Sequence, residues 1–163
     1  MPPDTLTTLV AAVGAKLRAS GWMLTTAESC TGGWVAQAVT AIAGSSDWFE
    51  RGFVTYSDAA KQEMLGVSAR TLAAHGAVSE QTARDMATGA LAHSRAQVAL
   101  AITGIAGPGG GSPEKPVGMV CFAWAAAGDK ISVDTRYFEG DRESVRRQSV
   151  IVALQGLAQL LEG

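Results

Sequence analysis

Cysteine and histidine are scarce in this chain of 163 residues, which has two of each. Cys30 and Cys121 are too few to build a disulfide framework. The sequence has no C-x-x-C and no H-E-x-x-H pattern, and His75 and His93 stand far apart. Because zinc sites need such clusters of ligands, we predict that the chain holds no metal ion.

An excess of basic charge and long apolar runs are missing as well. Thirteen lysines and arginines face fifteen acidic residues, and no long Lys/Arg run occurs, so nonspecific binding to nucleic acid is not expected. No run reaches the roughly 18 apolar residues of a membrane span. The first residues, MPPDTLTTLV, lack the basic and apolar parts of a signal peptide. We therefore predict a cytoplasmic protein without a nucleic-acid or membrane partner.

The chain does have 47% hydrophobic residues against 17% charged ones, enough to bury a core in one domain over residues 1–163. Apolar residues recur at helical spacing from Leu6 to Leu17, and short extended segments alternate with further helices. Gly21 and Gly44 are expected to end the first two helices. The pattern predicts a three-layer α/β/α sandwich with a mixed sheet of about five strands, near residues 22–27, 49–57, 97–103, 117–127 and 130–139.

Three loops rich in small residues follow predicted strands. They read AESCTGG at residues 27–33, YSDAAK at 56–61 and TGIAGPGGGS at 103–112. Ligands in open α/β sheets bind at the carboxyl ends of strands, so we expect these loops to form one site. The third loop matches neither the G-x-x-x-x-G-K-[ST] nor the G-x-G-x-x-G nucleotide pattern, because a strand follows it. No cofactor is predicted.

Ser29 lies where the first loop passes into a helix. Free backbone N–H groups at Thr31, Gly32 and Gly33, together with the helix dipole, would favour a substrate phosphate or an oxyanion. Alternatively, Thr31 only caps the helix. The segment is not a G-x-S-x-G nucleophile elbow, because Ala27 and Thr31 stand where that motif has glycines.

A serine nucleophile needs a base, and Lys61 is the best-placed candidate. It falls in a first helical turn near a strand end, where a cation is unfavourable; a solvated surface lysine is the alternative. His75 and His93 stand at expected helix ends, where a positive charge suits the dipole. Tyr56 is a candidate to orient Lys61 or relay a proton, and a half-buried strand tyrosine is the alternative there.

Glycines in the third loop and arginines near residue 142 are further candidates for substrate contacts. Glycine lets a backbone approach a ligand closely, which points to Gly104 and Gly107 beside Thr103. Three arginines cluster within residues 142–147 at the start of the last helix. A guanidinium suits bidentate phosphate binding, and an exposed helical face is the alternative explanation.

Five motifs, read together, resemble one known family. TAESCTGG, GSSDWFERGFVTYS, HGAVSE, ITGIAGPGGGSPEKPVG and GDRESVRRQ are similar, in this order, to the motifs of the CinA C-terminal domain family over about residues 5–160. The resemblance implies an α/β/α fold, often a homodimer, and deamidation of nicotinamide mononucleotide to nicotinate mononucleotide and ammonia in pyridine-nucleotide recycling. The chain resembles the stand-alone form, without the pyrophosphatase-type domain of full-length CinA proteins.

The same resemblance implies roles for Ser29 as nucleophile and Lys61 as its partner. We expect Ser29 to attack the carboxamide and a neutral Lys61 to take its proton. Backbone N–H groups near Gly32 or Gly104 are expected to hold the oxyanion. The phosphate is expected to bind Arg142, with Ser45 or Ser46.

Two alternatives stay open. Cys30, with Glu28 and Lys61, supplies the residue types of a Cys–Glu–Lys amidase, although a small buried cysteine is a common core residue. The alternative of another class is a nucleotide-binding or regulatory module that turns nothing over.

Overall fold

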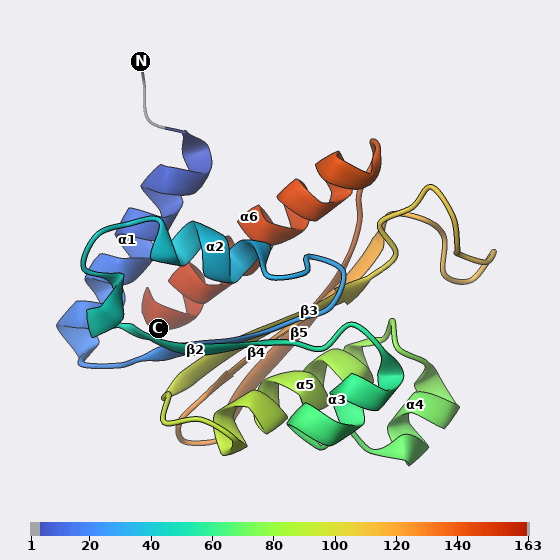
Figure 1. The fold of residues 1–163 in the computed structure, drawn as a ribbon, viewed down its shortest axis with the longest axis horizontal. Helices are drawn as coiled ribbons and strands as arrows, with labels where there is room; N and C mark the ends of the chain where they lie inside the picture. Colours follow the sequence, from blue (N-terminus) through green and yellow to red (C-terminus); the bar gives the residue numbers. More distant parts are fainter. Residues whose placement is uncertain (1–3, 163) are drawn as a thin grey trace.

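The structure, a computed structural model, describes residues 4–162. Its five-stranded sheet has the order β2-β1-β3-β4-β5 (Figure 1). β1 runs parallel to β2 and to β3, whereas β4 and β5 are antiparallel to their neighbours. The carboxyl ends of the three parallel strands therefore meet at one edge of the sheet. The strands are β1 (Leu24–Glu28), β2 (Phe49–Val54), β3 (Val98–Gly104), β4 (Met119–Ala126) and β5 (Lys130–Tyr137).

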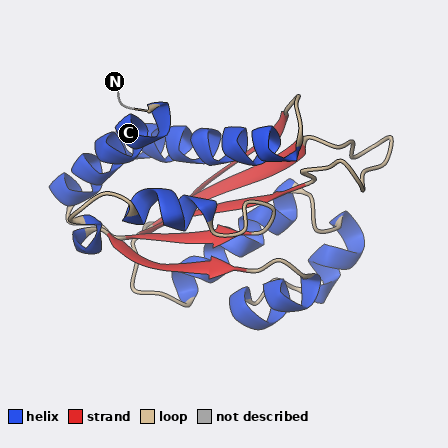
Figure 2. Ribbon diagram, turned by 45° about the horizontal axis from the view of Figure 1, so that its top comes forward, coloured by secondary structure: helices blue, strands red, loops and turns tan. Residues whose placement is uncertain are grey.

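Helices cover both faces of the sheet (Figures 1 and 2). One face carries α1 (Thr5–Ser20), α2 (Trp34–Thr40) and α6 (Arg142–Glu162), and α1 packs on α6. The other face carries α3 (Asp58–Leu65), α4 (Ala69–His75) and α5 (Glu80–Ala92), while a 3-10 turn, η1 (Ser45–Asp47), precedes β2. The predicted three-layer α/β/α sandwich with a mixed five-stranded sheet is confirmed.

Two apolar clusters fill the spaces between the sheet and its helices, one on each face. β1 is buried along its whole length, because helices lie over both sides of the central strands. On α5, a Cβ at Gly89 would come within 1.9 Å of the Leu65 carbonyl oxygen. The missing side chain lets the end of α3 pack directly on α5, which fixes the helix that carries Lys61.

Gly21 ends α1 as predicted, with a left-handed φ of 67°, whereas α2 ends before Gly44. Ser79 caps α5 by accepting the N–H of Thr82 at 3.0 Å. α2 ends at Thr40 and not at Gly44, because the chain turns at residues 41–44 to enter η1.

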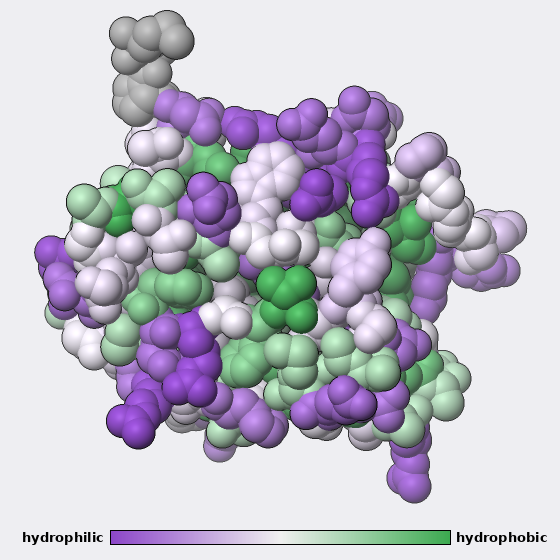
Figure 3. Space-filling model, viewed as in Figure 1, coloured by the Kyte–Doolittle hydropathy of each residue, from purple (hydrophilic) through white to green (hydrophobic). Residues whose placement is uncertain are grey.

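Within residues 4–162, no helix has the length and apolarity to cross a membrane. Figure 3 shows hydrophilic side chains gathered along the upper edge of the face in view and apolar ones toward its middle.

Candidate active site

The structure brings the three predicted loops together at the carboxyl ends of β1, β2 and β3. They surround a cavity of about 240 Å³. Ser29, Tyr56 and Lys61 line it with Arg142, and the remaining lining residues are Cys30, Ala77, Val78, Thr103, Gly104 and Ala106. A hydroxyl, an amine and a guanidinium thus share one small pocket.

Ser29 follows β1 directly and is held there by its backbone. Its N–H donates to the carbonyl of Ile102 in β3 at 3.0 Å. The neighbouring carbonyl of Glu28 accepts the N–H of Thr55 at 2.9 Å. These bonds carry the sheet pairing one residue past β1 and β2. Ser29 is therefore presented on rigid backbone and is only 7% exposed.

Lys61 reaches Ser29 from the first turn of α3. Its Nζ lies 3.0 Å from Ser29 Oγ, 3.0 Å from the Thr55 carbonyl oxygen and 3.1 Å from that of Tyr56. Lys61 is 1% exposed, so it is not a solvated surface lysine. Burial lowers the pKa of Lys61 below its usual value, against an opposing effect of Asp58.

The oxygens around Nζ determine what a neutral Lys61 can do. An ammonium has three N–H donors and can donate to all three oxygens. A neutral amine has two donors and one lone pair, and a carbonyl oxygen can only accept. The carbonyls of Thr55 and Tyr56 then take both donors, which leaves the lone pair for the hydroxyl proton of Ser29. This is the geometry that a general base for Ser29 requires.

The beginning of α2 is closed to a substrate anion, which corrects the expectation of a phosphate site there. The Glu28 carboxylate accepts the N–H groups of Val35 at 2.8 Å and Ala36 at 3.2 Å, and the hydroxyl of Thr31 at 2.7 Å. A buried carboxylate already satisfies this helix end and its dipole. Thr31 is not the cap either, because its hydroxyl donates to Glu28.

The backbone N–H groups after Ser29 are only partly engaged. The N–H of Gly32 donates to the Ser29 carbonyl at 3.1 Å, so it is not free for an oxyanion. Within the part of the chain that the structure describes, the N–H groups of Cys30, Thr31 and Gly33 have no acceptor, and of these residues Cys30 lines the cavity. Gly32 and Gly33 have φ values of 60° and 103°, which glycine adopts most easily. The turn itself therefore accounts for both glycines.

The third loop contributes a wall of the cavity. Thr103 lines the cavity, and its hydroxyl donates to the carbonyl of Ala77 at 2.7 Å. At Gly104, a Cβ would come within 2.7 Å of Val120 Cγ2, so close packing on β4 explains why this residue is a glycine. Its backbone still borders the cavity.

Arg142, the first residue of α6, spans the mouth of the cavity. It donates through Nη1 to the Gly107 carbonyl at 2.8 Å and through Nη2 to Tyr56 Oη at 3.4 Å. Tyr56 is 64% exposed, and it contacts Lys61 through its backbone carbonyl. The phenol therefore faces the mouth and Arg142, while the Tyr56 carbonyl orients the lysine.

Ser45 and Ser46 are not brought to this cavity. They belong to η1, which precedes β2, whereas Tyr56 and Lys61 follow it. Since β1 and β2 are parallel, the two serines lie at the opposite end of the sheet from Ser29. The expectation that they hold a substrate phosphate with Arg142 is corrected by this topology.

The sequence between residues 6 and 161 matches the profile of the CinA C-terminal domain. The chain belongs to the CinA C-terminal domain family. Nicotinamide-nucleotide amidohydrolase PncC of Escherichia coli strain K12 is 59% identical over 147 residues, which are 90% of this chain and 89% of that protein. The protein of the same name from Pseudomonas putida is 52% identical over 157 residues, 96% of this chain and 98% of its own.

Solved structures of the CinA family have the same fold. The competence/damage inducible protein CihA from Agrobacterium tumefaciens superposes with a TM-score of 0.94 at 48% identity, covering 100% of this chain and 99% of that one. A competence damage-inducible protein A from Klebsiella pneumoniae gives a TM-score of 0.94 at 43% identity, with 98% of both chains covered.

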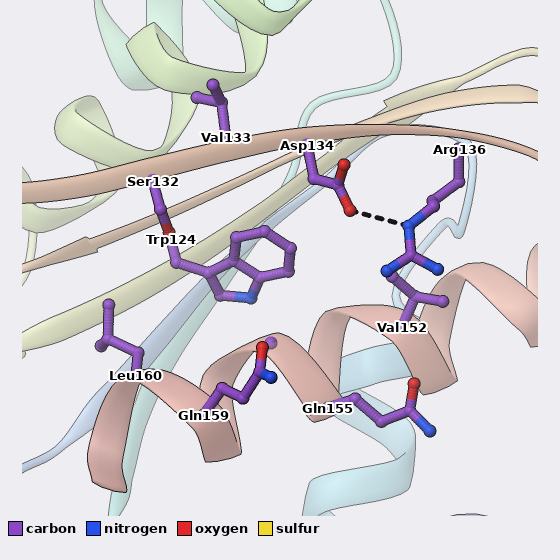
Figure 4. Close-up of a pocket in the computed structure, with 10 residues that line it drawn as sticks. Trp124, Ser132, Val133, Asp134, Arg136, Val152, Gln155, Gln159 and Leu160 are labelled. Atoms are coloured by element: carbon purple, nitrogen blue, oxygen red, sulfur yellow. Dashed lines mark hydrogen bonds and ion pairs between the residues drawn. The ribbon is translucent and has the colours of Figure 1, made fainter. Parts of the chain in front are cut away.

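Other parts of this CinA domain offer less chemistry. A larger cavity of about 630 Å³ lies between β5 and α6 (Figure 4). There the Arg136 guanidinium is paired with Asp134 at 2.7 Å, and the hydroxyl of Ser132 has no lysine or histidine beside it in the lining. His75 and His93 do not line the cavity at Ser29. Within residues 4–162, no cluster of His, Cys, Asp or Glu is arranged to hold a metal ion.

Arg146 is one of the three arginines that the sequence groups at the start of α6, but its contact with the backbone after Ser29 was not predicted. Its Nε donates to the Cys30 carbonyl and its Nη2 to the Thr31 carbonyl, both at 3.0 Å. The available signal was its spacing of one helical turn from Arg142, which puts both side chains on one face of α6. The sequence does not reveal which groups Arg146 binds, because every residue has a backbone carbonyl whatever its side chain.

The Cys30 thiol is poorly suited to replace Ser29 as nucleophile. It is 6% exposed and packs in the core cluster under α2 and α6. Burial raises the pKa of Cys30 to about 12, although Arg146 acts in the opposite direction, and a thiol that stays protonated is a weak nucleophile. The carboxylate that a Cys–Glu–Lys amidase would need from Glu28 is already engaged at α2.

We therefore expect Cys30→Ala to keep deamidase activity within about tenfold of the parent, since alanine retains the backbone N–H and removes only a protonated thiol. Steady-state ammonia release from nicotinamide mononucleotide measures this. If Cys30→Ala is inactive although circular dichroism shows that it is folded, the Cys30 thiol and not the Ser29 hydroxyl would be the nucleophile.

Proposed function

We propose that this chain hydrolyses the carboxamide of nicotinamide mononucleotide, giving nicotinate mononucleotide and ammonia, with Ser29 as nucleophile and Lys61 as base. The names of relatives that are 52% and 59% identical over most of both chains support the reaction. The distance of 3.0 Å between Lys61 Nζ and Ser29 Oγ, in a cavity of about 240 Å³, carries the mechanism.

Acylation begins with Ser29 Oγ attacking the carboxamide carbon while its proton passes to Lys61 Nζ. The carbonyl oxygen becomes an oxyanion, for which the N–H group of Cys30 and the backbone at Gly104 are the candidates, since both residues line the cavity. Lys61 then protonates the amide nitrogen, the C–N bond breaks, and ammonia leaves an acyl ester on Ser29. In the second half, Lys61 takes a proton from water as the water oxygen attacks the ester carbon. The bond to Ser29 Oγ then breaks, and Lys61 returns the proton to Oγ as nicotinate mononucleotide leaves.

The substrate itself helps to keep Lys61 neutral. Its pyridinium ring carries a positive charge, and like charges disfavour the protonated form of a nearby amine. Burial acts on the pKa of Lys61 in the same direction before substrate arrives. Both effects favour a base at neutral pH.

The phosphate is assigned to the side of Arg142. A volume of about 240 Å³ is below the roughly 300–1,000 Å³ of ordinary ligand sites, so the whole nucleotide exceeds it. A neighbouring hollow of about 480 Å³ shares Ala106 and Arg142 with it. The nicotinamide end is then placed in the inner cavity at Ser29, and the phosphate against the Arg142 guanidinium at the mouth, short of Asp141 and Glu143 in the hollow.

Arg142→Ala should raise KM for nicotinamide mononucleotide about tenfold and lower kcat much less, because a phosphate contact stabilises substrate and transition state alike. Nicotinamide riboside, which lacks the phosphate, should be a poor substrate for the parent and should lose little further in the variant. Equal losses of kcat/KM for both substrates would remove Arg142 from phosphate binding.

Ammonia release from nicotinamide mononucleotide, followed together with nicotinate mononucleotide by chromatography, tests the proposed reaction. Binding of the nucleotide without turnover would favour the regulatory module.

We also propose a cytoplasmic location, which agrees with two free, buried cysteines. The homodimer stays a prediction that sedimentation can test.

A further inference from the structure

Arg146 joins α6 to the turn that follows Ser29. Besides its bonds to the carbonyls of Cys30 and Thr31, its guanidinium carbon lies 5.5 Å from the ring centroid of Trp34. Two charge-assisted hydrogen bonds and an aromatic face hold the planar group in one orientation. Arg146 is half-buried, so solvent competes only in part for these contacts.

The carbonyls that Arg146 binds fix the direction of a backbone N–H. In a trans peptide the C=O and N–H groups point in opposite directions, so a fixed Cys30 carbonyl fixes the N–H of Thr31. The Ser29 carbonyl, held by the N–H of Gly32 at 3.1 Å, fixes the N–H of Cys30 in the same way. The Thr31 carbonyl bound by Arg146 likewise fixes the N–H of Gly32, and through it the Ser29 carbonyl and the N–H of Cys30. Cys30 lines the cavity and its N–H has no acceptor in the described part of the chain, whereas Thr31 is fully buried.

The opposite side of the same turn is held by a negative charge. Glu28 accepts the hydroxyl of Thr31 and two N–H groups of α2. The turn is therefore clamped between a carboxylate from β1 and a guanidinium from α6. At Gly32, a Cβ would lie 3.5 Å from Arg146 Nη2, which is ordinary contact, so the arginine fits closely without displacing the turn.

We propose that Arg146 is a positioning residue for deamidation: it holds the peptide planes after Ser29 so that the N–H group of Cys30, which lines the cavity, is aimed at the oxyanion. This inference rests on the proposed function. Arg146 acts through the backbone and has no hydrogen bond to Ser29 or Lys61 in the structure. Its effect belongs to the transition state, where the oxyanion forms, and not to substrate binding.

Arg146→Ala should lower kcat about 10²-fold, the cost of losing an oxyanion donor or displacing reacting groups by about 1 Å. KM should change less than about threefold. Arg146→Lys keeps the charge but lacks the fork that reaches two carbonyls, so its kcat should fall between. Millimolar guanidinium should restore part of kcat in Arg146→Ala. Arg147→Ala is the matched control, because Arg147 pairs with Asp4 on the surface.

Each outcome bears on the inference. The inference is overturned if Arg146→Ala and Arg146→Lys both have the same kcat as Arg147→Ala, when rates are expressed per folded enzyme measured by circular dichroism. It is also overturned if Arg146→Ala raises KM and leaves kcat unchanged. A shifted pKa in the kcat/KM profile of Arg146→Lys also overturns it, because Arg146 would then act on Lys61. If Arg146→Ala does not fold, Arg146→Lys decides alone. Absence of ammonia release by the parent chain instead defeats the proposed function, and this inference with it.

Discussion

Ser29→Ala should reduce deamidation at least about 10⁴-fold, since loss of a serine nucleophile removes the covalent route altogether. The fold should persist, because Ser29 is placed by its backbone N–H bond to Ile102, which alanine keeps. Loss of the Ser29 hydroxyl also leaves Lys61 Nζ hydrogen-bonded to the carbonyls of Thr55 and Tyr56. The variant should therefore bind nucleotide with nearly unchanged affinity.

The measurement pairs initial rates of ammonia release with calorimetric binding of nicotinamide mononucleotide to the inactive protein. Ser132→Ala is the matched control, because Ser132 lines the larger cavity beside α6 and should leave kcat/KM unchanged. Substantial turnover by Ser29→Ala, or loss of activity in Ser132→Ala, would move the reaction away from the cavity at Ser29.

The convergence of the three loops was predictable because it depends on strand direction. Alternating helices and strands predict parallel pairing, and parallel strands bring the ends that precede Ser29 and Tyr56 to one edge. The same rule places Ser45 at the far edge, since it precedes β2. Because Ser45 comes before β2 and Tyr56 comes after it, the order of the sequence alone was enough to exclude Ser45 from the site at Ser29.

Contacts made by and to the backbone were not predictable in the same way. Nothing in the residue types says that Glu28 turns back to close α2, or that Arg146 binds carbonyls 115 and 116 positions away in sequence. Both follow from tertiary packing, which brings α6 beside the turn after β1. The sequence signal for an open helix N-terminus was real, but a carboxylate of the same chain occupies it.

Lys61→Met should be as inactive as Ser29→Ala while keeping the fold. Methionine fills the buried space without an amine, and the parent lysine is costly there when charged, since burial disfavours the ammonium. Thermal unfolding at several pH values tests the direction of the Lys61 pKa shift, because the shift makes the free energy of unfolding depend on pH. The folded pKa lies below the unfolded value, so the parent chain loses stability as pH falls from the ordinary lysine range toward the lowered pKa. Lys61→Met should lack this part of the pH dependence.

The pH profile separates a base from a mere positive charge. A base must be neutral, so kcat/KM of the parent should rise with pH through the pKa of Lys61 in the free enzyme. The pKa in the kcat profile should be lower still, because the pyridinium charge of bound substrate disfavours the ammonium. Lys61→Arg keeps a cation that cannot deprotonate, and it should be about as inactive as Lys61→Met. Appreciable activity in Lys61→Arg, with a flat kcat/KM profile, would leave Lys61 as an electrostatic anchor and require another group to take the proton of Ser29.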